Sequence, residues 1–213
     1  MAASTKNQSS ESGNPQTLKI VGIIAAVILL LLLVAVVSGV IGDEEPGNEY
    51  GEPQVSGQLS LMPPDAQVDT SANGETAPVV IGQDFDGNEV RIENDGRPKA
   101  VVLLAHWCPH CQNEVPAVQA WLDSGGGVEG VDMYSVATAM SSTRDNFPSS
   151  EWLDREGWTV PVIRDDSSDS IHTAYGSGGF PFWVFVNSDG SVALRVAGAT
   201  TVENLESIMS ELT

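Results

Sequence analysis

Apolar and polar positions divide the 213-residue chain into four stretches of different character. Residues 1–19 are mostly polar, and residues 20–41 form an apolar run of 22 residues that holds no charged side chain. Residues 42–78 are acidic and rich in Pro and Gly, and residues 79–213 alternate between short apolar and polar blocks. This pattern predicts a disordered head, a membrane span, a linker and one folded domain.

Within the folded stretch, short apolar runs are separated by turn residues, which indicates alternating strands and helices. The runs at 100–105 and 131–137 predict buried strands. Residues 112–122 carry apolar side chains at helical spacing and end just before a glycine cluster, which predicts a helix. The other predicted strands are 79–81, 89–92, 160–163, 182–187 and 192–197, and the other predicted helices are 149–155, 168–175 and 202–212. This order predicts an α/β fold with a mixed central sheet and helices on both faces.

The apolar run at 20–41 is long enough to cross a bilayer, since a helix covers about 33 Å in 22 residues. The run exceeds the apolar part of a signal peptide, and no Ala-x-Ala site follows it, so we predict an uncleaved signal anchor. Lys6 and Lys19 precede the span, and the next basic residue is Arg91. This asymmetry places residues 1–19 in the cytoplasm and the domain outside the membrane.

The segment 42–78 holds eight acids, five prolines and five glycines, with no basic residue. Such a segment buries too little apolar surface to offset its chain entropy. It is predicted to be an extended, self-repelling tether between the membrane and the domain.

The charge balance excludes several functions, because 9 basic residues face 29 acidic ones and the net charge is −20. So few cations cannot form the basic patch of a nucleic-acid binder, nor a surface that docks to anionic lipid. The two cysteines are too few for a disulfide-stapled scaffold or a four-cysteine zinc site. The acidity predicts a solvated surface suited to solubility or a salty medium, or steering of cationic partners.

Both cysteines lie in one motif, in which Trp107 is followed by Cys108, Pro109, His110 and Cys111. A predicted buried strand leads into the motif and a predicted helix leads out of it. A disulfide here would close a loop of only four residues, which gives a structural staple little entropic benefit. The partial positive charge of a helix start instead favours a thiolate at Cys108, a good nucleophile and leaving group.

The neighbouring residues fit the same chemistry. Pro109 suits the first helical position, and His110 can add positive charge beside the thiolate. Cys111 is near enough to attack a mixed disulfide and release the partner. The motif therefore predicts dithiol–disulfide exchange with Cys108 attacking, Cys111 resolving, and no cofactor beyond their redox-active disulfide. Two alternatives remain: a copper or zinc site that includes His106, and an inert structural disulfide.

Several further motifs follow one another in a familiar order. They are Gly96-Arg97-Pro98 before a strand, Trp107-Cys108-Pro109-His110-Cys111, Pro116 in the next helix, Tyr175-Gly176 with Gly179-Phe180-Pro181, Asn187-Ser188-Asp189-Gly190, and Gly198. On these residues, the stretch 79–213 resembles the thioredoxin superfamily, and within it the membrane-anchored, extracytoplasmic TlpA/ResA-like branch.

The resemblance implies a substrate-binding surface beside the cysteines. It implies a cis peptide bond before Pro181, with that proline facing Cys108. It also implies that the backbone of Phe180 pairs with the incoming polypeptide like an added strand. Together with Trp107, these residues would position the substrate.

The chain departs from the family pattern at two positions. Val102 stands where thioredoxins often have a buried acid, so proton transfer at Cys111 must use water, a more distant carboxylate or His106. Phe182 follows the expected cis-proline, where Thr is frequent in the family. This change predicts either a more apolar docking surface or packing within a strand.

The direction of the reaction has two conflicting indications. The Pro-His dipeptide resembles that of the DsbA-type oxidases, whereas members of the TlpA/ResA-like branch often reduce disulfides, for example on apocytochrome c. We favour oxidation, because the dipeptide acts directly on the thiolate. The expected partners are thiols and disulfides of exported proteins and a membrane or extracytoplasmic redox protein. The alternatives are a disulfide reductase of the cytochrome c maturation type and a copper metallochaperone.

Overall fold

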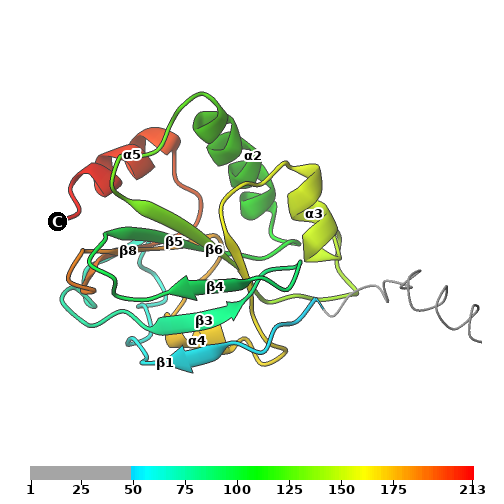
Figure 1. The fold of residues 1–213 in the computed structure, drawn as a ribbon, viewed down its shortest axis with the longest axis horizontal. Helices are drawn as coiled ribbons and strands as arrows, with labels where there is room; N and C mark the ends of the chain where they lie inside the picture. The colour runs from blue at the N-terminus through cyan, green and yellow to red at the C-terminus, as the bar shows by residue number, and fades with distance from the viewer. Residues whose placement is uncertain (1–48) are drawn as a thin grey trace, which may run out of the picture. The chain divides into compact units, whose positions relative to one another are not determined.

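A six-stranded mixed sheet is the centre of residues 49–213, the part of the chain that the computed structural model describes (Figure 1). From edge to edge its strands are β2 (Val68–Asp69), β9 (Val192–Ala197), β8 (Phe182–Val186), β5 (Lys99–Leu104), β6 (Asp132–Ala137) and β7 (Val162–Arg164). β5 pairs in parallel with β6 and antiparallel with β8. The predicted mixed sheet is therefore confirmed.

The predicted head, the predicted membrane span and residues 42–48 lie outside the described residues. Within residues 49–213, no helix has the length and apolar character needed to cross a membrane.

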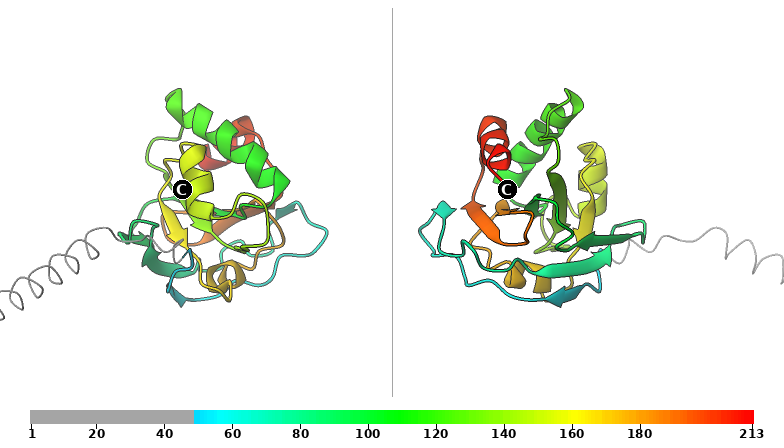
Figure 2. Two further views of the ribbon diagram at one scale, coloured as in Figure 1. Left: turned by 90° about the vertical axis from the view of Figure 1, so that its right-hand side faces the viewer. Right: turned by 60° about the vertical axis from the view of Figure 1, so that its left-hand side comes forward.

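Helices cover both faces of the central sheet, as the sequence predicts. α2 (Pro109–Asp123), α3 (Ser149–Arg155) and α5 (Val202–Ser210) lie on one side. α4 (Ser170–Ala174) lies on the other side, together with a smaller sheet (Figure 1). The views in Figure 2 show α2 in green and α5 in red next to each other.

The smaller sheet contains β1 (Gln54–Ser56), β3 (Val79–Gln83) and β4 (Glu89–Ile92). β3 and β4 contain the predicted strands 79–81 and 89–92 and pair antiparallel as a hairpin. Its turn is held by the Asp84 carboxylate, which accepts hydrogen bonds from the backbone N–H groups of Asp86 and Asn88 at 2.9 and 2.8 Å.

The structure explains the uninterrupted apolar run that follows Lys99 in β5. All six of its residues are buried, and alternate side chains enter different core layers. Val101 and Leu103 pack toward α4 and the smaller sheet, whereas Val102 and Leu104 pack toward α2, α3 and α5. The strand is buried on both faces, so it leads from the core directly to the cysteine motif.

Residues 49–78, the described part of the predicted linker, do not form the extended tether that the sequence predicts. Residues 49–78 are folded against the domain, where β1 pairs with β3 and β2 pairs with β9. Leu59, Met62 and Ala72 are buried in the core. The composition of the segment hides these anchors, because a few isolated apolar residues do not raise its average hydropathy.

The acids of this segment do not simply repel one another. Asp69 accepts a hydrogen bond from Nε of Arg195 at 2.9 Å, and both side chains are buried. Glu49 accepts hydrogen bonds from the backbone N–H and the hydroxyl of Ser150, at the start of α3. Specific partners in the domain therefore fix a segment that charge counting predicts to be extended.

Candidate active site

The cysteine motif lies where β5 ends and α2 begins. Cys108 is the residue before the first helical residue, with φ −79° and ψ 121°, and Pro109 occupies the first turn. The backbone carbonyl of Cys108 accepts the hydrogen bond from Gln112 N at 3.0 Å. No side chain caps this helix start, so its partial positive charge is directed at the residues of the motif.

The two thiols are free and differ in their access to solvent. Cys108 retains 7% of its surface, whereas Cys111 retains none. Burial raises the pKa of the Cys111 thiol far above its ordinary value, and the neighbouring Cys108 and Glu114 act in the same direction. A partner can therefore reach only Cys108 from outside.

The residue before Pro181 lies beside the first cysteine. The Phe180–Pro181 peptide bond is cis. The Sγ atom of Cys108 lies 3.5 Å from the carbonyl oxygen of Phe180. The loop before β8 thus brings Phe180 and Pro181 to the sulfur from a segment more than 70 positions later in the chain.

Aromatic side chains surround this contact. The indole N–H of Trp107 donates to the carbonyl of Ala139 at 2.7 Å, and its ring meets that of Phe180 edge-on at 5.9 Å. The Phe180 ring also contacts the His172 ring, with 5.1 Å between the ring centres. Phe182, by contrast, is fully buried in the core, which supports its interpretation as strand packing.

His110 in the motif and His106 just before it have different environments. His110 is exposed in the first turn of α2. His106 is buried, with Nδ1 at 2.7 Å from the Asp145 carbonyl and Nε2 accepting from the Ser141 N–H at 3.1 Å. Burial lowers the pKa of His106, and these bonds fix the neutral tautomer that is protonated on Nδ1.

This arrangement bears on the predicted metal alternative. Both ring nitrogens of His106 are engaged by backbone groups, so the imidazole does not point to the cysteines as a ligand. Among residues 49–213, no group of three His, Cys, Asp or Glu side chains is placed to hold a metal ion.

A buried carboxyl group lies one helical turn beyond Cys111. Glu114 retains 5% of its surface. Its Oε1 accepts hydrogen bonds from the indole N–H of Trp183 at 2.9 Å and from Thr200 N at 3.4 Å. Its Oε2 has no hydrogen-bond partner among the described residues, and burial raises its pKa to about 7. Glu114 can therefore hold or release a proton near neutral pH.

Comparison with known proteins identifies the family, since the Redoxin family model matches residues 72–209, more than half of the chain. The chain belongs to the Redoxin family. It is similar to the thiol-disulfide oxidoreductase ResA of Geobacillus thermodenitrificans, with 28% identity over 63% of this chain and 75% of the relative. The sporulation thiol-disulfide oxidoreductase A of Bacillus subtilis is 22% identical over 70% of this chain and 88% of the relative.

Solved structures agree with this assignment. MTB dsbF is 26% identical, with a TM-score of 0.51 over 62% of this chain and 94% of that one. A DsbF homologue from Corynebacterium diphtheriae has the same fold, with a TM-score of 0.57 at 13% identity over 73% of this chain and all of that one. This Redoxin-family chain thus has a thioredoxin-like fold and is a protein thiol-disulfide oxidoreductase.

Sequence reasoning missed Glu114 as a buried carboxyl group beside the cysteines of this Redoxin-family site. The helical spacing contains a signal for it, since Glu114 lies on the same side of α2 as Cys111, Val115 and Val118, all of which are buried. An acid among the apolar positions of a helix indicates a buried, functional carboxyl group.

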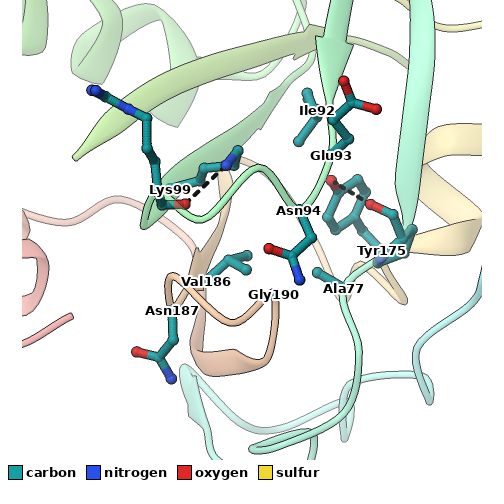
Figure 3. A pocket seen from close by; sticks show the side chains of 11 residues that line it. Ala77, Ile92, Glu93, Asn94, Lys99, Tyr175, Val186, Asn187 and Gly190 are labelled. Carbon is teal, nitrogen blue, oxygen red and sulfur yellow. Dashed lines mark hydrogen bonds between the residues drawn. The ribbon is translucent and has the colours of Figure 1, made fainter. Parts of the chain in front are cut away.

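A separate small pocket lies away from the cysteines (Figure 3). It is lined by the end of β4, the residue after α4 and the turn between β8 and β9. The Tyr175 hydroxyl donates to the Pro78 carbonyl at its wall, at 3.4 Å. None of the predicted site residues lines this pocket, so it is not part of the candidate active site.

Proposed function

We propose that this chain is a membrane-anchored, extracytoplasmic thiol–disulfide oxidoreductase that donates disulfides to exported proteins. The observation that carries the proposal is the position of Cys108. Its sulfur is at a helix start, is the more accessible of the two, and lies 3.5 Å from the Phe180 carbonyl. Residues 20–41 would supply the anchor, since they form an uncharged apolar run of 22 residues.

In the oxidised protein, a thiolate of the client attacks Sγ of Cys108. The Cys108–Cys111 bond breaks, and Cys111 leaves as a thiolate that takes up a proton. A second client thiolate then attacks the client sulfur of the mixed disulfide, and Cys108 leaves. Two electrons pass to the protein, the client gains a disulfide, and an extracytoplasmic or membrane redox partner reoxidises the cysteines.

Glu114 fits the proton step at Cys111. Val102 leaves the strand without an acid, and His106 is held away by its backbone bonds. Glu114 has a pKa of about 7, and its negative charge contributes to the raised pKa of Cys111. We therefore assign it to hold the proton that the Cys111 sulfur gains or loses, through water where needed.

Phe180, Pro181 and Trp107 would position the client. The Phe180 carbonyl lies beside the reactive sulfur, where an extended polypeptide can add to the exposed backbone. Trp107 contacts the Phe180 ring and supplies an apolar wall.

The direction toward oxidation rests on His110, which is exposed in the first turn of α2 and can stabilise the Cys108 thiolate of the reduced form. A second candidate is disulfide reduction, which the burial of Cys111 favours. Burial raises the pKa of that thiol, so the reduced form gains no stabilisation from a thiolate at Cys111.

The reduction potential of the full chain separates the two directions. A value of about −120 mV supports disulfide donation, and a value of about −270 mV overturns it in favour of reduction. The Cys111→Ala variant should trap a mixed disulfide with its client, because the resolving thiol is lost. The matched Cys108→Ser variant should trap none; if it traps the same client, the assignment of Cys108 is wrong.

A further inference from the structure

A continuous row of side chains crosses the active site on either side of Cys108. The guanidinium carbon of Arg144 lies 4.4 Å from the centre of the Trp107 ring. Trp107 contacts Phe180 at 5.9 Å, and Phe180 contacts His172 at 5.1 Å. The sulfur of Cys108 lies beside the middle of this row, at the Phe180 carbonyl.

The first end of the row is cationic. Arg144 is exposed and has no carboxylate within ion-pair distance among the described residues. Arg91, Arg97, Arg155 and Arg195, by comparison, each pair with an acid. In a chain of net charge −20, a guanidinium held over an aromatic ring beside the reactive sulfur without an acidic partner is available to a ligand.

The opposite end is apolar. His172 and Leu61 line the same groove, which borders the residues after α4. Leu61 is 74% exposed, and only it and Val68 are strongly exposed among the large hydrophobic residues of the described chain. The folded segment 49–78 thus holds an unburied leucine next to the active site.

We propose that this row binds the client polypeptide in extended form, with an acidic side chain of the client at Arg144 and an apolar one at Leu61. The two contacts lie on opposite sides of the reactive client cysteine. This proposal rests on the proposed function and defines its substrate class as cysteines that have an acidic and an apolar neighbour.

The dimensions fit such a segment. The row consists of three ring contacts of 4.4, 5.9 and 5.1 Å, followed by the groove at Leu61. An extended chain rises about 3.3 Å per residue, so about five residues cover this path. The acidic surface elsewhere repels an acidic client, so an acidic flank is favoured only where it meets Arg144.

The test measures second-order rates of exchange between the oxidised full chain and cysteine pentapeptides. The series contains Asp-Ala-Cys-Ala-Leu, the reverse order Leu-Ala-Cys-Ala-Asp, a version with Lys in place of Asp, and a version with Ala at both ends. One of the two acidic–apolar orders should react about three- to tenfold faster than the Ala peptide, and the Lys peptide should lack this advantage.

Two variants and two matched controls test whether the peptide preference arises at Arg144 and Leu61. Arg144→Gln should remove the advantage of Asp over Lys, and Leu61→Ser should remove the advantage of Leu over Ala. Arg91→Gln and Val68→Ser change an exposed cation and an exposed apolar residue on β4 and β2, and should change neither preference.

Dithiothreitol separates the failure of this proposal from failure of the proposed function. If wild type reacts with dithiothreitol and all peptides react alike, or if both variants slow every peptide equally, the row does not select clients and the proposal is wrong. If wild type exchanges with neither dithiothreitol nor any peptide, the proposed function itself fails.

Discussion

Replacing Glu114 by Gln should change the pH dependence of stability. The carboxyl group is buried, and its pKa in the folded protein is about 7 against an ordinary value of 4.5. Gln keeps the size of the side chain and an oxygen that can accept from Trp183, but it cannot ionise. The buried Oε2 lacks a partner in wild type, so an amide group there is as poorly satisfied as the carboxylic acid.

The sign of the pH dependence follows from whether the Glu114 carboxyl loses its proton at a lower pH in the folded or in the unfolded state. Below about pH 4.5 the carboxyl is protonated in both states and contributes no pH dependence. As the pH rises from about 4.5 to about 7, the unfolded chain ionises while the folded chain still holds the proton, so the unfolded state is stabilised and the free energy of unfolding falls. The difference between the two pKa values corresponds to a loss of about 3 kcal/mol in the free energy of unfolding, at about 1.4 kcal/mol per pKa unit.

Urea unfolding of the reduced full chain at a series of pH values measures this effect. The difference in free energy of unfolding between Glu114→Gln and wild type should move in favour of Gln by about 3 kcal/mol between about pH 4 and about pH 8.5. Glu206→Gln alters an exposed carboxyl group on α5 and should show no comparable trend. A Glu114→Gln difference that is the same at every pH would refute the assignment of a raised pKa.

Three further changes test the remaining contacts. Asp69→Ala leaves the buried Arg195 unpaired and should lower the free energy of unfolding by about 3–5 kcal/mol in urea titrations, whereas Asp65→Ala, at an exposed position of the same segment, should have little effect. Trp183→Phe removes the hydrogen bond that Glu114 Oε1 accepts; since that bond lowers the carboxyl pKa, the loss of stability with rising pH in urea titrations should begin at the same pH as in wild type but continue to a higher pH. A chain that starts at residue 79 should show a lower urea midpoint than one that starts at residue 46, because it lacks β1, β2 and their buried residues, and equal midpoints would contradict this.

Local patterns in the sequence were sufficient to predict most strands and helices of the domain. β5 is apolar after Lys99 because both of its faces are covered, and the hairpin of β3 and β4 follows from its turn residues. The segment 49–78 could not be predicted in this way. Its anchors are single residues such as Asp69 and Leu59, whose partners lie far along the chain. Long-range pairing of isolated residues leaves no periodic signal.

The same distinction holds within the active site. Cys108, Cys111 and the cis-proline at 181 belong to short motifs, so they could be predicted before the fold was known. The neutral state of His106 could not, because it depends on the backbone groups of Asp145 and Ser141. From the sequence, His106 could be a metal ligand or a proton carrier for Cys111. Its hydrogen bonds to the backbone of Asp145 and Ser141 show that it has a structural role.

Glu114 shows how one chemical requirement can be met from a different element of the fold. Val102 on β5 and Cys111 on α2 belong to the same core layer, and that layer also contains Trp183. An acid at 102 would reach this layer from the strand, whereas Glu114 reaches it from the helix and is held by the Trp183 indole. Because Glu114 and Cys111 share one helix, their spacing is set by local helical geometry and not by the packing of α2 on the sheet. The electrostatic coupling between this carboxyl group and the thiol should therefore persist through adjustments of α2 against the sheet.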